Sequence, residues 1–290
     1  MNLYDVAFAP FAEFGFMRRA LVGCLALALG CGPIGTILVV RRMSLMGDAL
    51  SHAVLPGAAL GFIVAGVSLP AMSLGGVAAG LVVALLSGLV TRLTPLREDA
   101  SFAGFYLISL ALGVLLVSIH GSNVDLLHLL FGSILAIDDA ALILIGGIAT
   151  ASLLLLAIIY RPLVVECFDP GFLRAVGGRG GLVHTLFLAL VVLNLVAGFQ
   201  ALGTLMAVGL MMLPAAAARF WVRELWSLSA ASSVLALASG FLGLLLSYHL
   251  DLPSGPAIVL VAGFGYLASV TLGPRDSLRA LYVRRAHLEA

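Results

Sequence analysis

The chain has 290 residues, of which 62% are hydrophobic and only 10% are charged, and its formal net charge is +1. Soluble globular domains carry about 25% charged residues, so this composition excludes a soluble protein and indicates an integral membrane protein. A net charge this close to zero also argues against nucleic acid as a partner.

Apolar runs of about 18 to 25 residues, the length that crosses ~30 Å of hydrocarbon, follow one another along the chain. They cover residues 20–40, 46–66, 70–91, 101–119, 138–160, 182–199, 203–220, 227–247 and 254–272. No polar stretch between them is long enough to suggest a soluble domain. The sequence therefore predicts an all-α integral membrane protein, a single transmembrane domain over 1–290 with eight or nine membrane-spanning helices.

The arginines indicate which side of the membrane each connector faces. Most of them fall in alternate connectors, which the positive-inside rule places in the cytoplasm. These are Arg41, Arg42, Arg92, Arg97, Arg161, Arg174, Arg179, Arg219, Arg223, Arg275, Arg279, Arg284 and Arg285. Nine crossings would put Arg18 and Arg19 on the outer side. Either those two lie at the outer interface, or one of the segments does not fully cross.

Two shorter segments are predicted to form helices that do not span. Residues 125–135, "DLLHLLFGSIL", could form a half-helix in the outer leaflet, which membranes tolerate only where protein or water satisfies the helix ends. Residues 166–178, "ECFDPGFLRAVGG", predict a short cytoplasmic helix. In this helix Asp169 would be the N-cap and Pro170 the first helical residue, and a glycine would close the end.

The 166–178 helix would carry Phe168, Phe172 and Val176 on one face. One interpretation is a docking element that inserts into a groove of a cytoplasmic partner. The other is an interfacial helix lying on lipid. The sequence alone does not choose between them.

Asp48 and His52 are the unusual residues of the membrane segments. If Arg41 and Arg42 mark the inner interface, Asp48 lies ~10 Å and His52 ~16 Å further along the helix. A charge at that depth costs at least ~2.5 kcal/mol, so it normally faces a bundle interior or an aqueous path. Their spacing puts both side chains on one helix face.

Three interpretations of this pair stay open: a hydrogen-bonded packing pair, a proton relay, or part of a metal site. One chain supplies only two ligands, so the metal interpretation requires a second copy across a twofold axis. Pro56 has no N–H, so we also expect a free carbonyl oxygen on His52, beside the pair.

Motifs for catalysis or ATP hydrolysis are missing from the sequence. "GCGPIGTI", residues 30–37, has the glycine spacing of a phosphate-binding loop, but Thr36 stands where that loop needs lysine. Neither a zinc-protease motif nor a nucleophile elbow occurs. The chain is therefore not expected to be an enzyme, and His184, at the start of a span, is assigned no role.

Several segments resemble one known family, the membrane permease subunits of bacterial zinc/manganese ABC importers. "RRMSLMGDALSHAVLPGAALGF" (41–62) resembles that family's signature, and "ECFDPGFLRAVG" resembles its cytoplasmic ATPase-contacting segment. "FGSIL" (131–135) is similar to its outer half-helix region. "ALGTLMAVGLMMLPAAAAR" (201–219) and "LPSGPAIVLVAG" (252–263) are similar to its late spans.

This resemblance implies a multi-pass permease of the bacterial inner membrane that imports a divalent transition metal as a homodimer. Its partners would be cytoplasmic ATPase subunits, an extracytoplasmic metal-binding protein and the lipid membrane. Asp48 and His52 would bind the transported ion, and no cofactor would stay bound. The resemblance does not choose the metal. Zinc is favoured because two aspartates and two histidines make a four-coordinate zinc site, with manganese next and iron third. The ATPase-docking residues would be Phe168, Asp169, Pro170, Phe172 and Arg174. The alternative is a proton-coupled secondary metal transporter that needs no ATPase.

Overall fold

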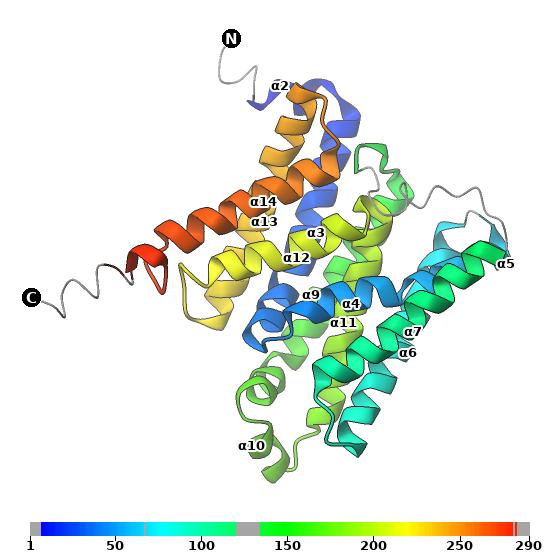
Figure 1. Cartoon of the computed structure of the whole chain (residues 1–290). Coiled ribbons are helices and arrows are strands. Elements are labelled where there is room, and N and C mark those ends of the chain that lie inside the picture. Colours follow the sequence, from blue (N-terminus) through cyan, green and yellow to red (C-terminus); the bar gives the residue numbers. More distant parts are fainter. Residues whose placement is uncertain (1–6, 67, 120–133, 281, 283–290) are drawn as a thin grey trace, which may run out of the picture.

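The computed structural model describes residues 7–66, 68–119, 134–280 and 282, and within these ranges every regular element is a helix (Figure 1). The elements in chain order are α2 (Ala9–Glu13), α3 (Gly15–Val40), α4 (Ser44–Ala53), α5 (Leu55–Ala65), α6 (Leu69–Leu93), α7 (Glu98–Ile119), η1 (Ile134–Ala136), α9 (Asp139–Phe168), α10 (Pro170–Ala175), α11 (Gly180–Leu202), α12 (Thr204–Ala218), α13 (Leu225–Leu250) and α14 (Ser254–Leu272). The all-helical prediction is confirmed.

Eight helical segments of the described chain are long and apolar enough to cross a membrane, with α4 and α5 counting as one. The ninth predicted span corresponds to α12, which has only 15 residues. Its end lies beside the end of α14, because the Arg275 amide donates to the Phe220 carbonyl at 3.1 Å. Its start follows α11 after the single residue Gly203. α12 therefore runs between the two sides of the bundle although it is short.

The arginine-bearing connectors gather at one end of the bundle, which is the lower left of Figure 1, together with α10 and the end of α14. The connectors α5–α6, α11–α12 and α13–α14 lie at the opposite end. This arrangement is consistent with the predicted sidedness, in which the positive-inside rule would make the arginine-rich end the cytoplasmic one. Arg19 lies at the outer end, where its Nη1 is 3.4 Å from Oδ1 of Asp139 at the start of α9. This ion pair fits the interpretation of Arg19 as interfacial.

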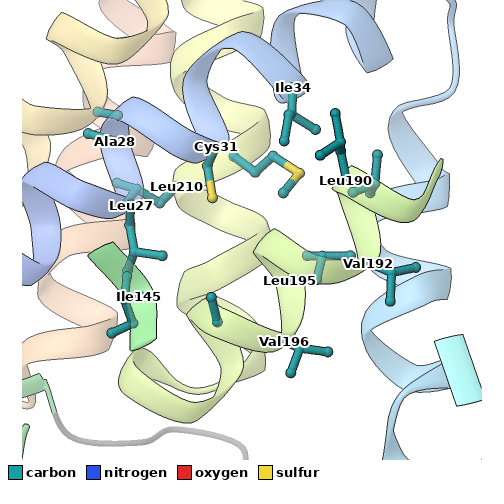
Figure 2. Close-up of a cluster of buried hydrophobic side chains, with 14 of the residues drawn as sticks. Leu27, Ala28, Cys31, Ile34, Ile145, Leu190, Val192, Leu195, Val196 and Leu210 are labelled. Carbon is teal, nitrogen blue, oxygen red and sulfur yellow. The ribbon is translucent and has the colours of Figure 1, made fainter. Parts of the chain in front are cut away.

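Helix α3 forms the centre of the bundle, packed against α9, α11, α12 and α13. Its side chains meet those of α9, α11 and α12 in a buried apolar cluster, which Figure 2 shows from Leu27 and Cys31 to Leu195 and Leu210. A buried polar contact joins two of the surrounding helices, since Asn194 Nδ2 of α11 donates to Ser152 Oγ of α9 at 2.7 Å.

Glycines set how closely these helices approach α3. A Cβ added at Gly30 would overlap Asn194 of α11, and one at Gly35 would overlap the backbone carbonyl of Met211 in α12. Lipid supplies no hydrophobic drive for helix association, so such backbone contacts must come from small residues. Glycines of α3 thus allow α11 and α12 to pack directly against its backbone.

One predicted segment differs from the structure, and another lies mostly outside the described residues. The predicted cytoplasmic helix over 166–178 is only Pro170–Ala175, because α9 continues to Phe168. Phe168 is thus the last residue of a long helix rather than part of the short one. Most of the predicted half-helix at 125–135 falls outside the described residues, and its last two residues belong to the 3₁₀ turn η1.

We predict that Gly35→Ala will destabilise the folded protein by about 1–3 kcal/mol, because the new methyl group overlaps a carbonyl that cannot move independently of α12. Thermal unfolding of the detergent-solubilised chain would measure the loss. Gly147→Ala is the matched control, since a Cβ at that exposed position of α9 meets no atom within 4 Å. Equal stability of the two variants would contradict the close-packing role.

Candidate functional site

The Asp48–His52 pair lies on α4, as the sequence predicted. The two residues are one helical turn apart, and His52 Nε2 is 3.8 Å from Asp48 Oδ1. This separation is longer than a hydrogen bond but within the reach of an ion pair, so the two groups lie on the same face of α4 without a hydrogen bond between them.

The two side chains differ in their exposure. In the single chain the Asp48 side chain is 64% exposed and the His52 side chain 31%. His52 Nδ1 is buried and has no hydrogen-bond partner among the described residues. A carboxylate this open on a membrane-crossing helix indicates a surface that another molecule covers or water reaches.

The backbone breaks just beyond the pair, between α4 and α5. Pro56 lacks the N–H that would continue the helix, and Val54 is the single residue between α4 and α5. The His52 carbonyl lacks its usual helical partner because Pro56 has no N–H; the Val54 amide, which bonds to the Leu50 carbonyl at 3.2 Å, also approaches it. The carbonyl of Ala53 instead accepts a hydrogen bond from Ser109 Oγ of α7 at 3.0 Å.

Helix α7 forms the other wall of the site. Its Tyr106 ring lies against the His52 ring, with 6.5 Å between centroids and a 30° angle between planes. A surface hollow of about 190 Å³ runs between the two helices, and Asp48, Asp99 and Tyr106 are among its lining residues. The sequence analysis did not single out these α7 residues. The sequence could have indicated them, because positions 99, 102, 103 and 106 have the spacing of residues on one helix face.

One chain does not complete a metal site. Within the described ranges no three His, Cys, Asp or Glu side chains gather closely enough to hold an ion. Carboxylate and imidazole are nevertheless the donors that suit Zn, Mn and Fe(II). The chain therefore presents two candidate ligands on an open face.

The second predicted site, the cytoplasmic helix α10, is well capped. Asp169 accepts a hydrogen bond from the Phe172 amide at 2.8 Å, and Pro170 is the first helical residue, both as predicted. After the C-terminal end of α10, Gly177 has a left-handed backbone conformation with φ +75°. The Gly178 amide donates to the Leu173 carbonyl at 2.8 Å. This turn holds α10 in one conformation.

The outer face of α10 is apolar and unburied. Phe172 and Val176 are 55% and 60% exposed, and Phe168, at the end of α9, is 68% exposed. Arg174 stays on its own helix, where Nε donates to the Pro170 carbonyl at 3.2 Å. The five predicted docking residues therefore lie together at the arginine-rich end, around a capped turn.

The family to which the chain belongs follows from a comparison with protein-family models. Residues 13–273 match the model described as the ABC 3 transport family. The chain belongs to the ABC 3 transport family. A protein of this family is the membrane component of an ABC transporter, so the prediction that the chain is not an enzyme is confirmed.

Curated relatives of this family cover nearly the whole chain. It is 35% identical over 264 residues to the manganese import system permease protein ScaB of Streptococcus parasanguinis, covering 91% of this chain and 93% of that protein. The manganese transport system membrane protein MntC of Halalkalibacterium halodurans is 31% identical over 278 residues, covering 96% of this chain and 94% of that protein.

Two solved structures have the same fold. The chain superposes on a structure described as PsaBC from Streptococcus pneumoniae in complex with Fab, with a TM-score of 0.83, 32% identity, and coverage of 95% of this chain and 98% of that chain. A putative metal-chelate type ABC transporter in an inward-facing conformation gives a TM-score of 0.70 at 16% identity, over 87% of this chain and 85% of that chain, and shows the fold only. The resemblance read from the sequence is thereby confirmed.

We predict that Asp169→Ala will lower the free energy of local unfolding of α10 by about 1 kcal/mol, because the Phe172 amide loses its acceptor. Hydrogen–deuterium exchange of the α10 amides would then speed up by roughly fivefold, while the α9 amides stay unchanged. Asp169→Asn keeps a side-chain acceptor and serves as the control. Unchanged exchange in the alanine variant would contradict the capping role.

Proposed function

We propose that this chain is the membrane permease of an ATP-driven importer of a divalent transition metal, with manganese as the leading cargo. The observation that carries the proposal is the Asp48–His52 pair, held within a membrane-crossing segment of a chain that belongs to the ABC 3 transport family. Such a pair is costly in a membrane unless it meets a polar cargo.

Manganese replaces the zinc that the sequence analysis favoured. That preference came from counting two aspartates and two histidines as a tetrahedral zinc site. The curated relatives cited above are named as manganese import or transport proteins, and carboxylate and imidazole donors also suit manganese. Zinc remains the competing cargo, and direct comparison of the two ions separates them.

A homodimer is part of the proposal, because one chain offers only two ligands. A twofold axis running past α4 would bring two Asp48–His52 pairs together and give four donors. The 64% exposure of the Asp48 side chain and the open hollow between α4 and α7 support an uncovered face at this position. Tyr106 and Asp99 would then lie along the same path.

ATP hydrolysis would occur on a separate cytoplasmic subunit that docks on α10. The exposed Phe168, Phe172 and Val176 form an apolar surface about a rigid turn, which suits insertion into a groove of a partner. An extracytoplasmic metal-binding protein would deliver the ion at the opposite end. Family membership favours this arrangement over the proton-coupled secondary transporter, which would need no ATPase.

Asp48→Asn and His52→Ala should each lower manganese uptake at least about tenfold, since losing a ligand worth ~1.4 kcal/mol lowers affinity by that factor. The measurement is ATP-dependent uptake of radioactive manganese into proteoliposomes holding the complete complex, with zinc uptake measured in parallel. Asp276→Asn is the control, because it removes the same charge at a left-handed residue that asparagine tolerates. Wild-type uptake by both site variants would contradict the proposed pathway.

Phe172→Asp should uncouple the ATPase, because a charge replaces an apolar group at the centre of the proposed docking surface. We expect the ATPase to dissociate from the purified complex and uptake to fall with it, while membrane insertion persists. Leu278→Asp, which places the same charge on an exposed apolar residue outside α10, is the control. If ATPase still co-purifies with the Phe172 variant and uptake persists, α10 is not the docking site.

A further inference from the structure

A chain of three polar side chains crosses the cytoplasmic end of the bundle. Arg41 Nη1 lies 2.9 Å from His184 Nδ1, and His184 Nε2 lies 2.8 Å from Glu98 Oε1. The three residues come from the α3–α4 connector, the second turn of α11 and the first residue of α7. His184 therefore bridges segments that are far apart in the sequence.

The partners of His184 determine its protonation state. A guanidinium can only donate, so Nδ1 must accept from Arg41. A carboxylate can only accept, so Nε2 must carry the proton and donate to Glu98. The imidazole is thus neutral, with a defined tautomer and both nitrogens bonded.

Burial makes this arrangement hard to break. His184 is 8% exposed and the Glu98 side chain 31%. Hydrogen bonds that involve a charged group are strong in such surroundings, and a partner left behind unpaired is costly. The three groups should move together rather than separate.

On one side, the bridge is connected to the docking helix. Leu173 of α10 is buried, and a Cβ at Gly178 would overlap it. The Glu166 carboxylate at the end of α9 packs against Gly180, the first residue of α11, so closely that a Cβ there would overlap it. His184 follows Gly180 by one turn. α10 and the end of α9 are therefore packed closely against the start of α11.

On the other side, the bridge is connected to both walls of the candidate metal path. The turn that carries Arg41 into α4 is tight: Arg42 has φ +60°, and the Met43 amide donates to the Leu38 carbonyl at 2.9 Å. Glu98 begins α7, and its neighbour Asp99 lines the hollow that holds Asp48. Arg41 and Glu98 thus hold the cytoplasmic starts of α4 and α7.

We propose that His184 is a positioning residue that transmits movement of the ATPase-docking helix to the two helices of the metal path. The inference rests on the proposed function above, and adds to it the physical connection between ATP hydrolysis and the site. His184 does not bind the ion. Its neutral ring holds Arg41 and Glu98 in fixed positions relative to α11, so α4 and α7 follow when α11 shifts.

The test replaces His184 in the complete complex and measures transported manganese per ATP hydrolysed. His184→Leu keeps a similar volume but breaks both bonds, and we expect uptake per ATP to fall about tenfold, equivalent to ~1.4 kcal/mol of lost coupling. Manganese affinity, measured on the same complex without ATP, should stay within about twofold of wild type, because the Asp48–His52 pair is untouched. His249→Leu, near the opposite end of the bundle, should change neither quantity.

His184→Gln should restore much of the coupling, because its amide oxygen can accept from Arg41 and its amide nitrogen can donate to Glu98. Glu98→Gln tests the other bond without depending on the leucine variant. The double variant Glu98→Gln with His184→Leu should be no worse than His184→Leu alone, since both changes break one connection.

Two outcomes would overturn the inference. One is unchanged uptake per ATP in both His184→Leu and Glu98→Gln. The other is a parallel loss of assembly, ATP hydrolysis and manganese binding that glutamine does not rescue, which would mark His184 as a general packing residue. Absence of ATP-dependent metal uptake by the wild-type complex would instead contradict the proposed function itself, so the two failures are distinguishable.

Discussion

Close backbone contact around α3 is the constraint on which the rest of the structure depends. Lipid tails are as apolar as the side chains, so a side chain gains little hydrophobic free energy by moving from lipid to a neighbouring helix. Helices in a membrane therefore hold together through short-range packing and buried hydrogen bonds. Gly30 and Gly35 let α11 and α12 reach the backbone of α3, and Asn194 ties α11 to α9. This fixed centre gives α4, α7 and α10 a frame against which they are positioned.

The frame positions the charged groups of the candidate site. Asp48 lines the hollow between α4 and α7, His52 lies one turn further along α4, and the break before Pro56 is stabilised by a hydrogen bond from Ser109. The polar bridge at His184 joins the same two helices to the segment that follows α10. These polar groups thus connect the start of α11 with the starts of α4 and α7.

Local features were predicted well because they depend on local chemistry. The span positions follow from the length of apolar runs, the sidedness from arginines, and the α10 cap from Asp169, Pro170 and the closing glycines. Predictions failed where a helix end depends on its neighbours. Phe168, expected within the short cytoplasmic segment, is instead the last residue of α9.

The sequence by itself determined the fold class, the grouping of arginines in alternate connectors, the candidate ligands Asp48 and His52 and the apolar face near Phe172. Each of these follows from spacing along a single helix or connector. Only the tertiary structure brought Tyr106 and Asp99 to the candidate site and joined Arg41, His184 and Glu98. Those residues are separated by up to 143 positions, and helix periodicity carries no information about which helices become neighbours. Which helices become neighbours depends on how well their surfaces fit together, and glycines at the contacts allow the close approach.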